Sequence, residues 1–191
     1  MKPLLTRHVR KQRRRVILPL VRGDVLDIGC GRAGWIDVLA DDQFYVGVDI
    51  DQKALDSCSK RHPRRTFYRR NLDVEPLELG DHRFDTVIMA AVIEHLRSPE
   101  HVLCEVRSLL KPGGLFLVTT PSPFGDMVHK IGSRLGLFRA ESDVGHVKIY
   151  GRRALLNIVT ECGYEVVRFS RFSMGINQLV VCRSAESKGS R

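Results

Sequence analysis

The residues with the clearest chemical potential form a glycine-rich turn near the N-terminus. The segment VLDIGCGRAG (25–34) runs from an apolar stretch into Gly29 and Gly31, with Asp27 two positions before the first glycine. Glycine has no Cβ, so the backbone here can approach a ligand closely. Asp49 follows 18 residues after Gly31, where a carboxylate can accept hydrogen bonds from ribose hydroxyls. We therefore expect a nucleotide-type site, as found at the carboxyl ends of strands in open α/β sheets.

Two classes of ligand fit this turn. Gly29, Gly31 and Gly34 have the spacing of the dinucleotide-binding pattern G-x-G-x-x-G. Asp27, however, would place a carboxylate where a pyrophosphate is repelled and a cationic sulfonium or ammonium is tolerated. The residues favour a cationic ligand and leave the dinucleotide open.

Two histidines are candidates for proton transfer to or from an acceptor. His95 follows an apolar stretch that ends near position 93, and His146 stands in the segment GHVKIY. A histidine with a pKa near neutrality can take a proton from a hydroxyl group. Each also has a structural interpretation, as a helix cap for His95 and as a loop anchor for His146.

Of two aromatic candidates for stacking on a substrate, Trp35 is expected in the core on the first helix and Tyr150 at the mouth of the pocket.

Alternating strands and helices must position these residues. Apolar β-branched runs predict strands, and helical spacing of apolar residues predicts helices. The expected strands are 24–30, 44–50, 66–72, 84–93, 115–120, 164–172 and 177–183, and the expected helices are 33–42, 52–61, 98–110 and 151–163. Ser98 is the expected N-cap of the third helix, and Lys111–Gly114 the turn that follows it.

This alternation predicts an α/β fold with a doubly wound, mostly parallel seven-stranded sheet and helices on both faces. The last two strands predict an antiparallel C-terminal edge hairpin. The stretch 121–149 interrupts the alternation, and residues 124–138 within it are expected to form a short amphipathic helix. Because connections of this length are often functional, we expect a lid over the active site.

Positive charge is concentrated at the N-terminus. Residues 1–23 contain eight of the 31 Lys and Arg and no acid, whereas residues 24–191 contain 23 basic and 22 acidic residues. We expect a basic arm or helix over 1–23, one domain over 24–183 and a disordered tail over 184–191. A second arginine cluster spans 61–70. Both clusters can attract phosphates, an anionic membrane or an acidic acceptor, or can be solvated faces.

Cysteine usage and hydropathy bear on metals and location. Five scattered cysteines without a C-x-x-C pair favour free, buried thiols over disulfides or a zinc site, and no metal is expected. No apolar run approaches the roughly 18 residues that cross a bilayer, so no transmembrane segment is expected. The apolar run 16–21 is too short for a secretory signal. We expect a cytoplasmic protein, and the sequence leaves its oligomeric state open.

Four motifs in order give a more specific indication. VLDIGCG, VGVDID, FDTVIMAAVIEHL and LLKPGGLFLVTTP resemble the motif series of class I (Rossmann-like) S-adenosylmethionine-dependent methyltransferases. The small-molecule branch, which includes quinone and sugar methyltransferases, is the most similar. The match covers about 24–120 and continues more loosely to 167. It implies an enzyme that transfers a methyl group from S-adenosylmethionine to a small-molecule acceptor, at a hydroxyl or amine of a metabolite or sugar.

The resemblance also implies a role for each residue of the cofactor site. Asp49 would bind the ribose hydroxyls, and Ile50 would pack against adenine. The methionine end of the cofactor would be contacted by Asp27, Gly29, Cys30 and Gly31. The adenine amino group would be contacted by Asn71, Leu72 and Asp73, and the pocket wall near the sulfonium would be formed by Ala90 and Val92. The chain departs from the family at Ala33, where the third glycine usually falls.

Three alternatives stay open at this point. An RNA methyltransferase would use the basic arm, but the fourth strand ends in MAAVIEH and lacks the Asn/Asp-Pro-Pro-Tyr/Phe stretch that grips a base amine. Nucleic acid is therefore a possible partner that the sequence does not favour. An NAD-type Rossmann oxidoreductase rests on the glycine spacing alone, which is a weak fingerprint. A non-catalytic binding module would keep the fold without the chemistry.

Overall fold

The computed structural model describes residues 4–32, 34–134 and 147–185. The helices are α1 (Leu4–Ile17), α2 (Gln52–Arg61), α3 (Pro99–Leu109), α4 (Pro123–Arg134) and α5 (Arg152–Glu161), with 3-10 turns η1 (Leu18–Leu20), η2 (Ile36–Val38) and η3 (Ile93–His95). The strands are β1 (Val25–Ile28), β2 (Tyr45–Asp49), β3 (Thr66–Arg69), β4 (Phe84–Ala90), β5 (Leu110–Pro121), β6 (Tyr164–Phe172) and β7 (Asn177–Ser184). No helix in the described part of the chain is both long enough and apolar enough to cross a membrane.

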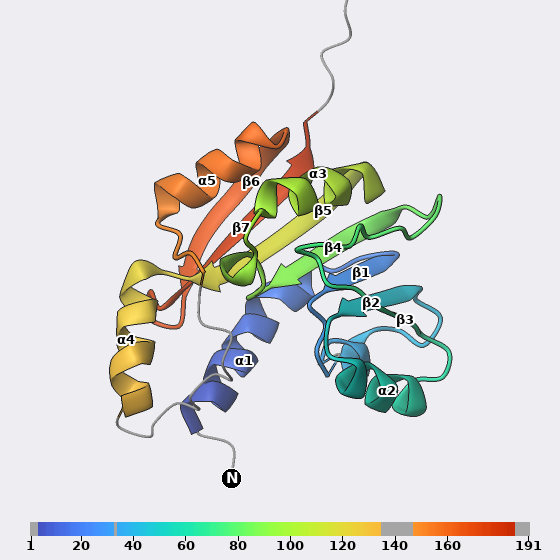
Figure 1. Cartoon of the computed structure of the whole chain (residues 1–191), viewed down its shortest axis with the longest axis horizontal. Coiled ribbons are helices and arrows are strands. Elements are labelled where there is room, and N and C mark those ends of the chain that lie inside the picture. The colour runs from blue at the N-terminus through green and yellow to red at the C-terminus, as the bar shows by residue number, and fades with distance from the viewer. Residues whose placement is uncertain (1–3, 33, 135–146, 186–191) are drawn as a thin grey trace, which may run out of the picture.

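The seven strands form one sheet in the order β3-β2-β1-β4-β5-β7-β6 (Figure 1). Strands β1 to β5 pair in parallel, whereas β7 runs antiparallel to both β5 and β6. The predicted fold class, including the C-terminal edge hairpin, is confirmed. Because the strand order reverses between β1 and β4, the carboxyl ends of these strands flank the crevice where open α/β sheets bind ligands.

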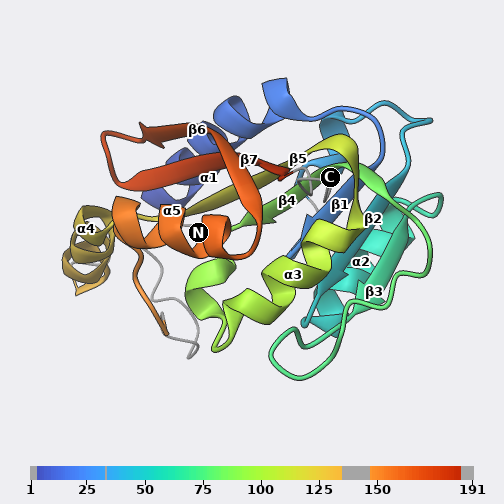
Figure 2. The ribbon, with the colours of Figure 1, turned by 90° about the horizontal axis from the view of Figure 1, so that it is seen from above.

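The core lies in two layers, one on each face of the sheet. Helices α3 and α5 cover one face, and α1 and α2 cover the other (Figures 1 and 2). Strand β4 contributes to both layers: Val87 and Met89 belong to the cluster under α3 and α5, and Ile88 belongs to the cluster with Ile17 of α1. A strand buried on both faces is expected to be continuously apolar, as β4 is from Val87 to Ala90.

The predicted helix 33–42 is wrong. In its place, only the 3-10 turn η2 forms, and the chain is extended again at Leu39. Trp35 and Ile36 are both buried, but Val38 is 47% exposed, so no apolar stripe of helical spacing continues along the segment. A short helix without such a stripe gains too little from packing to form. Trp35 therefore reaches the core, as expected, from a turn and not from a helix.

The predicted turn Lys111–Gly114 is a bulge within a strand. Strand β5 already pairs with β4 at Leu110 opposite Phe84, and the regular register resumes only at Leu115 opposite Thr86. The extra residues bulge out of the ladder, with Gly113 at a φ of +74°. The helix before it begins at Pro99 as predicted, but Ser98 makes no side-chain capping hydrogen bond.

Three other expectations are met only in part. Helix α4 forms at the start of the stretch 121–149, while residues 135–146 lie outside the described part. Strand β7 extends to Ser184, which pairs with Tyr164, so Ser184 belongs to the sheet and not to the predicted tail, whose residues 186–191 lie outside the described part. Cys104 is exposed because it lies on the solvent side of α3, whereas the other four cysteines are buried.

Candidate functional site

The turn after β1 has a backbone conformation that favours glycine. Gly29 and Gly31 have φ values of +71° and +51°. The backbone N–H groups of Gly29 and Cys30 donate to the carbonyl oxygen of Val48, at 2.8 and 3.0 Å. The turn is therefore attached to the end of β2, and the Cys30 side chain is buried beneath it.

Asp49, at the end of β2, binds this turn through its side chain. Its Oδ2 accepts from Gly31 N at 2.6 Å and its Oδ1 from Asp51 N at 2.9 Å. A carboxylate offers about four acceptor positions, so both oxygens keep capacity for a ligand hydroxyl. Ile50 beside it is 56% exposed. The carbonyl oxygen of Asp49 accepts from Arg70 N at 3.0 Å, which brings the segment after β3 to the same place.

Asp27, near the end of β1, is a fully buried carboxylate. Tyr45 donates its hydroxyl to Asp27 Oδ2 at 2.7 Å, while Oδ1 makes no hydrogen bond to the described residues. Burial raises the pKa of Asp27 to about 7, and the charge of Asp49 adds to this, against the opposing effects of the Tyr45 hydrogen bond and the nearby Trp35 side chain. A buried oxygen without a partner suits a cationic group, which would stabilise the ionised carboxylate.

The residues after β4 form the wall that faces the glycine turn. Ala91 has a φ of +61°, and its N–H donates to the carbonyl oxygen of Thr119 at 2.8 Å, so the chain turns sharply after Ala90. A Cβ placed on Gly29 would lie only 2.1 Å from Val92 Cγ2. The structure thus brings Val92 directly against the turn and ends β4 next to it, and the predicted contact of Ala90 and Val92 with a cofactor stays a prediction.

Residues 71–73 lie beside Asp49, but their side chains also have structural partners. Asn71 Oδ1 accepts from Asp73 N at 3.2 Å, and Asp73 Oδ1 accepts from Arg97 N at 2.8 Å. Leu72, between them, is half-buried and packs against the core. These bonds fix the loop shape and leave other acceptor positions on both side chains.

The two candidate histidines have different outcomes. His95 is half-buried at the end of η3, and its N–H donates to the carbonyl oxygen of Val92 at 2.9 Å. His146 lies outside the described residues, so its role stays a prediction. Tyr150, expected at the pocket mouth, is instead 1% exposed within the core, because its ring packs under α5. Across the described residues, no group of three or more His, Cys, Asp or Glu could hold a metal ion.

Glu94 is a buried acid to which the sequence analysis assigned no role. Its Oε2 accepts from Thr120 Oγ1 at 3.0 Å, and burial raises its pKa. Its carbonyl oxygen accepts from Val147 N and Lys148 N, at 2.9 and 3.1 Å. Glu94 thereby joins η3 to β5 and to the chain that follows residue 146. The signal in the sequence was an acidic residue directly after the apolar run VIMAAVI (87–93).

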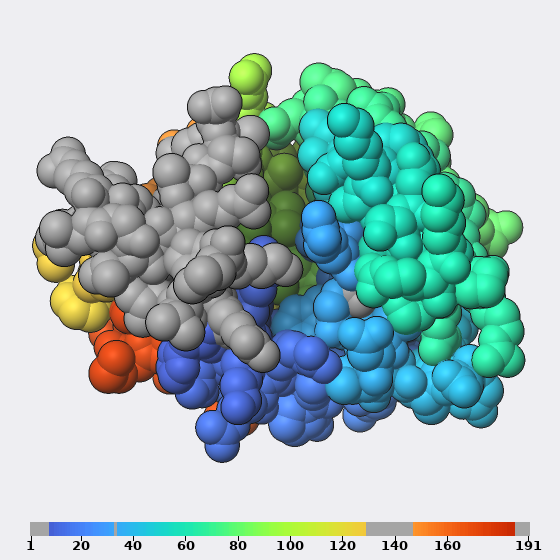
Figure 3. Space-filling view, turned by 90° about the horizontal axis from the view of Figure 1, so that it is seen from below, coloured from blue at the N-terminus to red at the C-terminus, as the bar shows by residue number. Residues whose placement is uncertain are grey.

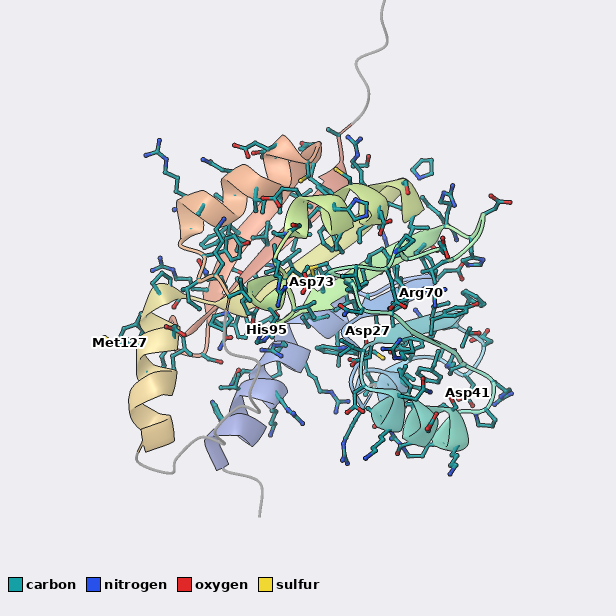
Figure 4. The ribbon with its side chains drawn as sticks, viewed as in Figure 1. Asp27, Asp41, Arg70, Asp73, His95 and Met127 are labelled. Atoms are coloured by element: carbon teal, nitrogen blue, oxygen red, sulfur yellow. The ribbon has the colours of Figure 1, made fainter. Side chains whose placement is uncertain are left out.

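Asp27, Asp73 and His95 lie near the middle of the molecule, whereas Asp41 and Met127 lie toward its edges (Figure 4). Seen from below, the molecule is hollowed beside the light-blue and teal residues of the β2 and α2 region, with green residues deep inside (Figure 3).

Comparison with known proteins identifies the family. A family model described as "Methyltransferase domain" matches residues 5–168. A probable S-adenosylmethionine-dependent methyltransferase of Mycolicibacterium smegmatis is 37% identical over 100 residues, which are 52% of this chain and 38% of that protein. A tRNA U34 carboxymethyltransferase of Hahella chejuensis is 35% identical, over 56% of this chain and 35% of that protein. A ubiquinone biosynthesis O-methyltransferase of Cereibacter sphaeroides is 34% identical, over 54% and 43%.

The match therefore spans less than half of the length of each of these curated relatives. Among solved structures, an S-adenosylmethionine-dependent methyltransferase from Mesorhizobium loti superposes with a TM-score of 0.69 at 20% identity, over 88% of this chain and 94% of that one. This structural similarity concerns the fold alone. The family model and the sequence relatives are consistent with that fold. The chain belongs to the methyltransferase-domain family, within the class I S-adenosylmethionine-dependent methyltransferases.

Proposed function

We propose that this chain transfers a methyl group from S-adenosylmethionine to a small-molecule acceptor that carries a hydroxyl or amine. The observation that carries the proposal is the glycine turn bound to Asp49: Gly31 N donates to Asp49 Oδ2 at 2.6 Å. At this turn the glycine backbone, which carries no side chains, lies beside a carboxylate that can accept hydrogen bonds from ribose hydroxyls. The dinucleotide alternative loses its support, because it rested on glycine spacing that the family shares.

The residues around the turn fit the cofactor in charge and shape. Asp49 would hold the ribose hydroxyls, and the exposed Ile50 would pack on the adenine ring. The free Oδ1 of Asp27 would face the cationic methionine end. The methionine end would also be contacted by Gly29, Cys30 and Gly31, and the adenine amino group by Asn71, Leu72 and Asp73. The pocket wall would be formed by Ala90 and Val92.

The chain's own contribution to the reaction is mainly positioning. The cofactor supplies a methyl group that is already activated for displacement. Alignment of two bound reactants can lower a barrier by about 7–11 kcal/mol, so few catalytic side chains are needed. His95, half-buried at the end of η3, or His146 would take a proton from the acceptor only if the acceptor is a hydroxyl that ionises during transfer.

A small molecule is favoured over RNA by the partners of the second arginine cluster (61–70). Arg61 donates to the carbonyl oxygen of Arg32 at 2.9 Å, and Arg65 donates to that of Ala40 at 2.7 Å. These guanidinium groups hold loops of the protein itself, which reduces what they offer to a phosphate backbone. RNA stays the second candidate, since one curated relative is named for its action on tRNA.

Calorimetric titration tests the cofactor directly. We expect S-adenosylmethionine and S-adenosylhomocysteine to bind with micromolar affinity and NADH not to bind. Incorporation of a labelled methyl group into hydroxylated metabolites and sugars, with tRNA alongside, would then identify the acceptor class. Absence of binding by both sulfur compounds would reject the proposal and favour a non-catalytic module.

Asp49→Ala is the variant that tests the site. Loss of a charged acceptor worth about 1.5–3 kcal/mol should weaken S-adenosylmethionine binding by about 10- to 100-fold in calorimetry. Asp56→Ala is the matched control, because Asp56 lies exposed on α2 and its side chain accepts a hydrogen bond from Gln52 of the same helix. Equal affinity in wild type and Asp49→Ala would show that the ribose is held elsewhere.

A further inference from the structure

Helix α1 presents a cationic face that the proposed reaction does not use. The helix contains no acidic residue. Arg10, Lys11 and Arg15 are exposed and Arg14 is half-exposed. At about 100° per residue these four side chains span an arc of roughly 140°, so they share one side of the helix. Ile17, at the end of α1, is fully buried and anchors this cationic face to the domain.

A second surface, the α4 patch, consists of the exposed apolar residues Phe124, Met127 and Met174. Phe124 and Met127 are three residues apart on α4 and are 52% and 51% exposed, while Met174 in the turn between β6 and β7 is 90% exposed. Residues three apart lie on the same side of a helix. Large apolar side chains exposed together usually mark an interaction site.

Hydrogen bonds hold the two parts of the α4 patch together. Ser122, just before α4, donates its N–H to the carbonyl oxygen of Ile176 at 2.8 Å. Its hydroxyl donates to the carbonyl oxygen of Gly175 at 2.6 Å. The start of α4 and the β6–β7 turn are therefore neighbours, and Met174 lies next to the helix that carries the other two residues.

The helices that carry the cationic face and the α4 patch lie on the same side of the molecule. Helices α1 and α4 both extend below the sheet in Figure 1, and both are visible from below in Figure 3, on the side that is hollowed. Met127 points outward from α4 (Figure 4). One flat partner could thus meet cationic and apolar side chains together.

We propose that this side of the protein binds the surface of an anionic lipid bilayer. The cations of α1 would contact phosphate-bearing headgroups, and the α4 patch would enter the apolar layer beneath them. A bilayer offers both chemistries at adjacent depths, whereas RNA has no apolar layer to receive the α4 patch. A second copy of this chain would bring two cationic helices together. The proposal does not depend on methyl transfer, but it would place the hollow near acceptors that partition into lipid.

The experiment is vesicle co-sedimentation of the full chain. The vesicles are phosphatidylcholine with or without phosphatidylserine, over a series of salt concentrations. We expect binding only with phosphatidylserine, and weaker binding as salt rises because screening reduces the attraction. Each cation near the surface contributes about fivefold in affinity, so removal of four should reduce binding at least 100-fold. The charge variant combines Arg10→Gln, Lys11→Gln, Arg14→Gln and Arg15→Gln.

Matched variants separate surface binding from folding and net charge. Loss of the α4 patch by Phe124→Ser, Met127→Ser and Met174→Ser should weaken binding at least tenfold, with Val74→Ser as the apolar control. The charge control combines four exposed arginines that lie on neither α1 nor α4: Arg83→Gln, Arg107→Gln, Arg153→Gln and Arg183→Gln. Circular dichroism and S-adenosylmethionine titration check that each variant is folded.

Four results would overturn the proposal. The first is wild-type protein that stays in the supernatant with anionic vesicles, and the second is a charge variant or an α4 patch variant that binds these vesicles as well as wild type does. RNA binding that is lost in the charge variant, without vesicle binding, would assign α1 to nucleic acid. A dimer in light scattering that the α4 patch variant dissociates, again without vesicle binding, would assign the patch to a second copy of this chain.

Discussion

At the scale of single residues, two carboxylates at the ends of neighbouring strands have opposite environments. Asp49 is partly exposed, and backbone N–H groups orient both of its oxygens. Asp27 is fully buried, and only one of its oxygens has a partner among the described residues. The sequence placed both carboxylates near a ligand from their positions at strand ends. It did not reveal Tyr45 as the partner of Asp27, because that contact depends on the alignment of β1 with β2.

The buried Asp27 should make folding stability depend on pH. Its pKa is about 7 in the folded protein and 3.8 in its ordinary state, so the folded chain binds more protons between these values. The contribution of Asp27 to the free energy of unfolding therefore falls as pH rises from about 4 to about 7, and it changes little above pH 7. Asp27→Asn should remove this slope. Urea denaturation between pH 4 and pH 7 measures this contribution as the unfolding free energy of wild type minus that of Asp27→Asn. A difference that does not change with pH would contradict a raised pKa at Asp27.

At the scale of elements, the glycine turn is shaped by strands that are distant in sequence. Its N–H groups bind the end of β2, and its outer side contacts the residue that follows β4 by two positions. The β5 bulge has the same character, since four residues of β5 stand against one of β4. Glycine spacing indicated both turns, but the pairing between strands decided their shapes.

Gly29→Ala should destabilise the domain far more than Gly34→Ala. Alanine at a φ of +71° costs about 1–2 kcal/mol, and its Cβ would collide with Val92 Cγ2 at 2.1 Å. Gly34 has no such φ, and a Cβ there meets nothing within 4 Å. Thermal unfolding of the two variants measures the difference. Comparable unfolding midpoints would show that the turn can adopt another conformation.

At the scale of the whole molecule, the N-terminal segment takes part in the core. The sequence predicted a basic arm or helix before the domain. In the structure Ile17 is 0% exposed and shares a cluster with Leu179 and Val181 of β7, more than 160 residues away in the chain. The family match also begins at residue 5, within α1. The segment thus combines a buried anchor with the cationic face of α1. The cytoplasmic location expected from the sequence stays a prediction.

Ile17→Ala should therefore destabilise the whole domain. Removal of a fully buried isoleucine side chain costs about 2–5 kcal/mol through lost burial and the cavity that it leaves. Val74→Ala is the control, since Val74 is 76% exposed and its truncation should change stability by less than about 0.5 kcal/mol. Chemical denaturation measures both. A small effect at Ile17 would mean that α1 is an appendage whose packing adds little.

The family, the order of most strands and helices, and the positions of the two carboxylates at strand ends were predictable from the sequence alone. These depend on local periodicity and on motifs within single segments. Tertiary structure decided that Asp27 is paired with Tyr45, that Gly29 lies against Val92, and that the predicted helix 33–42 is a short turn. It also placed helices α1 and α4 on the same side of the molecule. Each of these depends on contacts between segments far apart in the chain, which burial and strand pairing select and which no local pattern encodes.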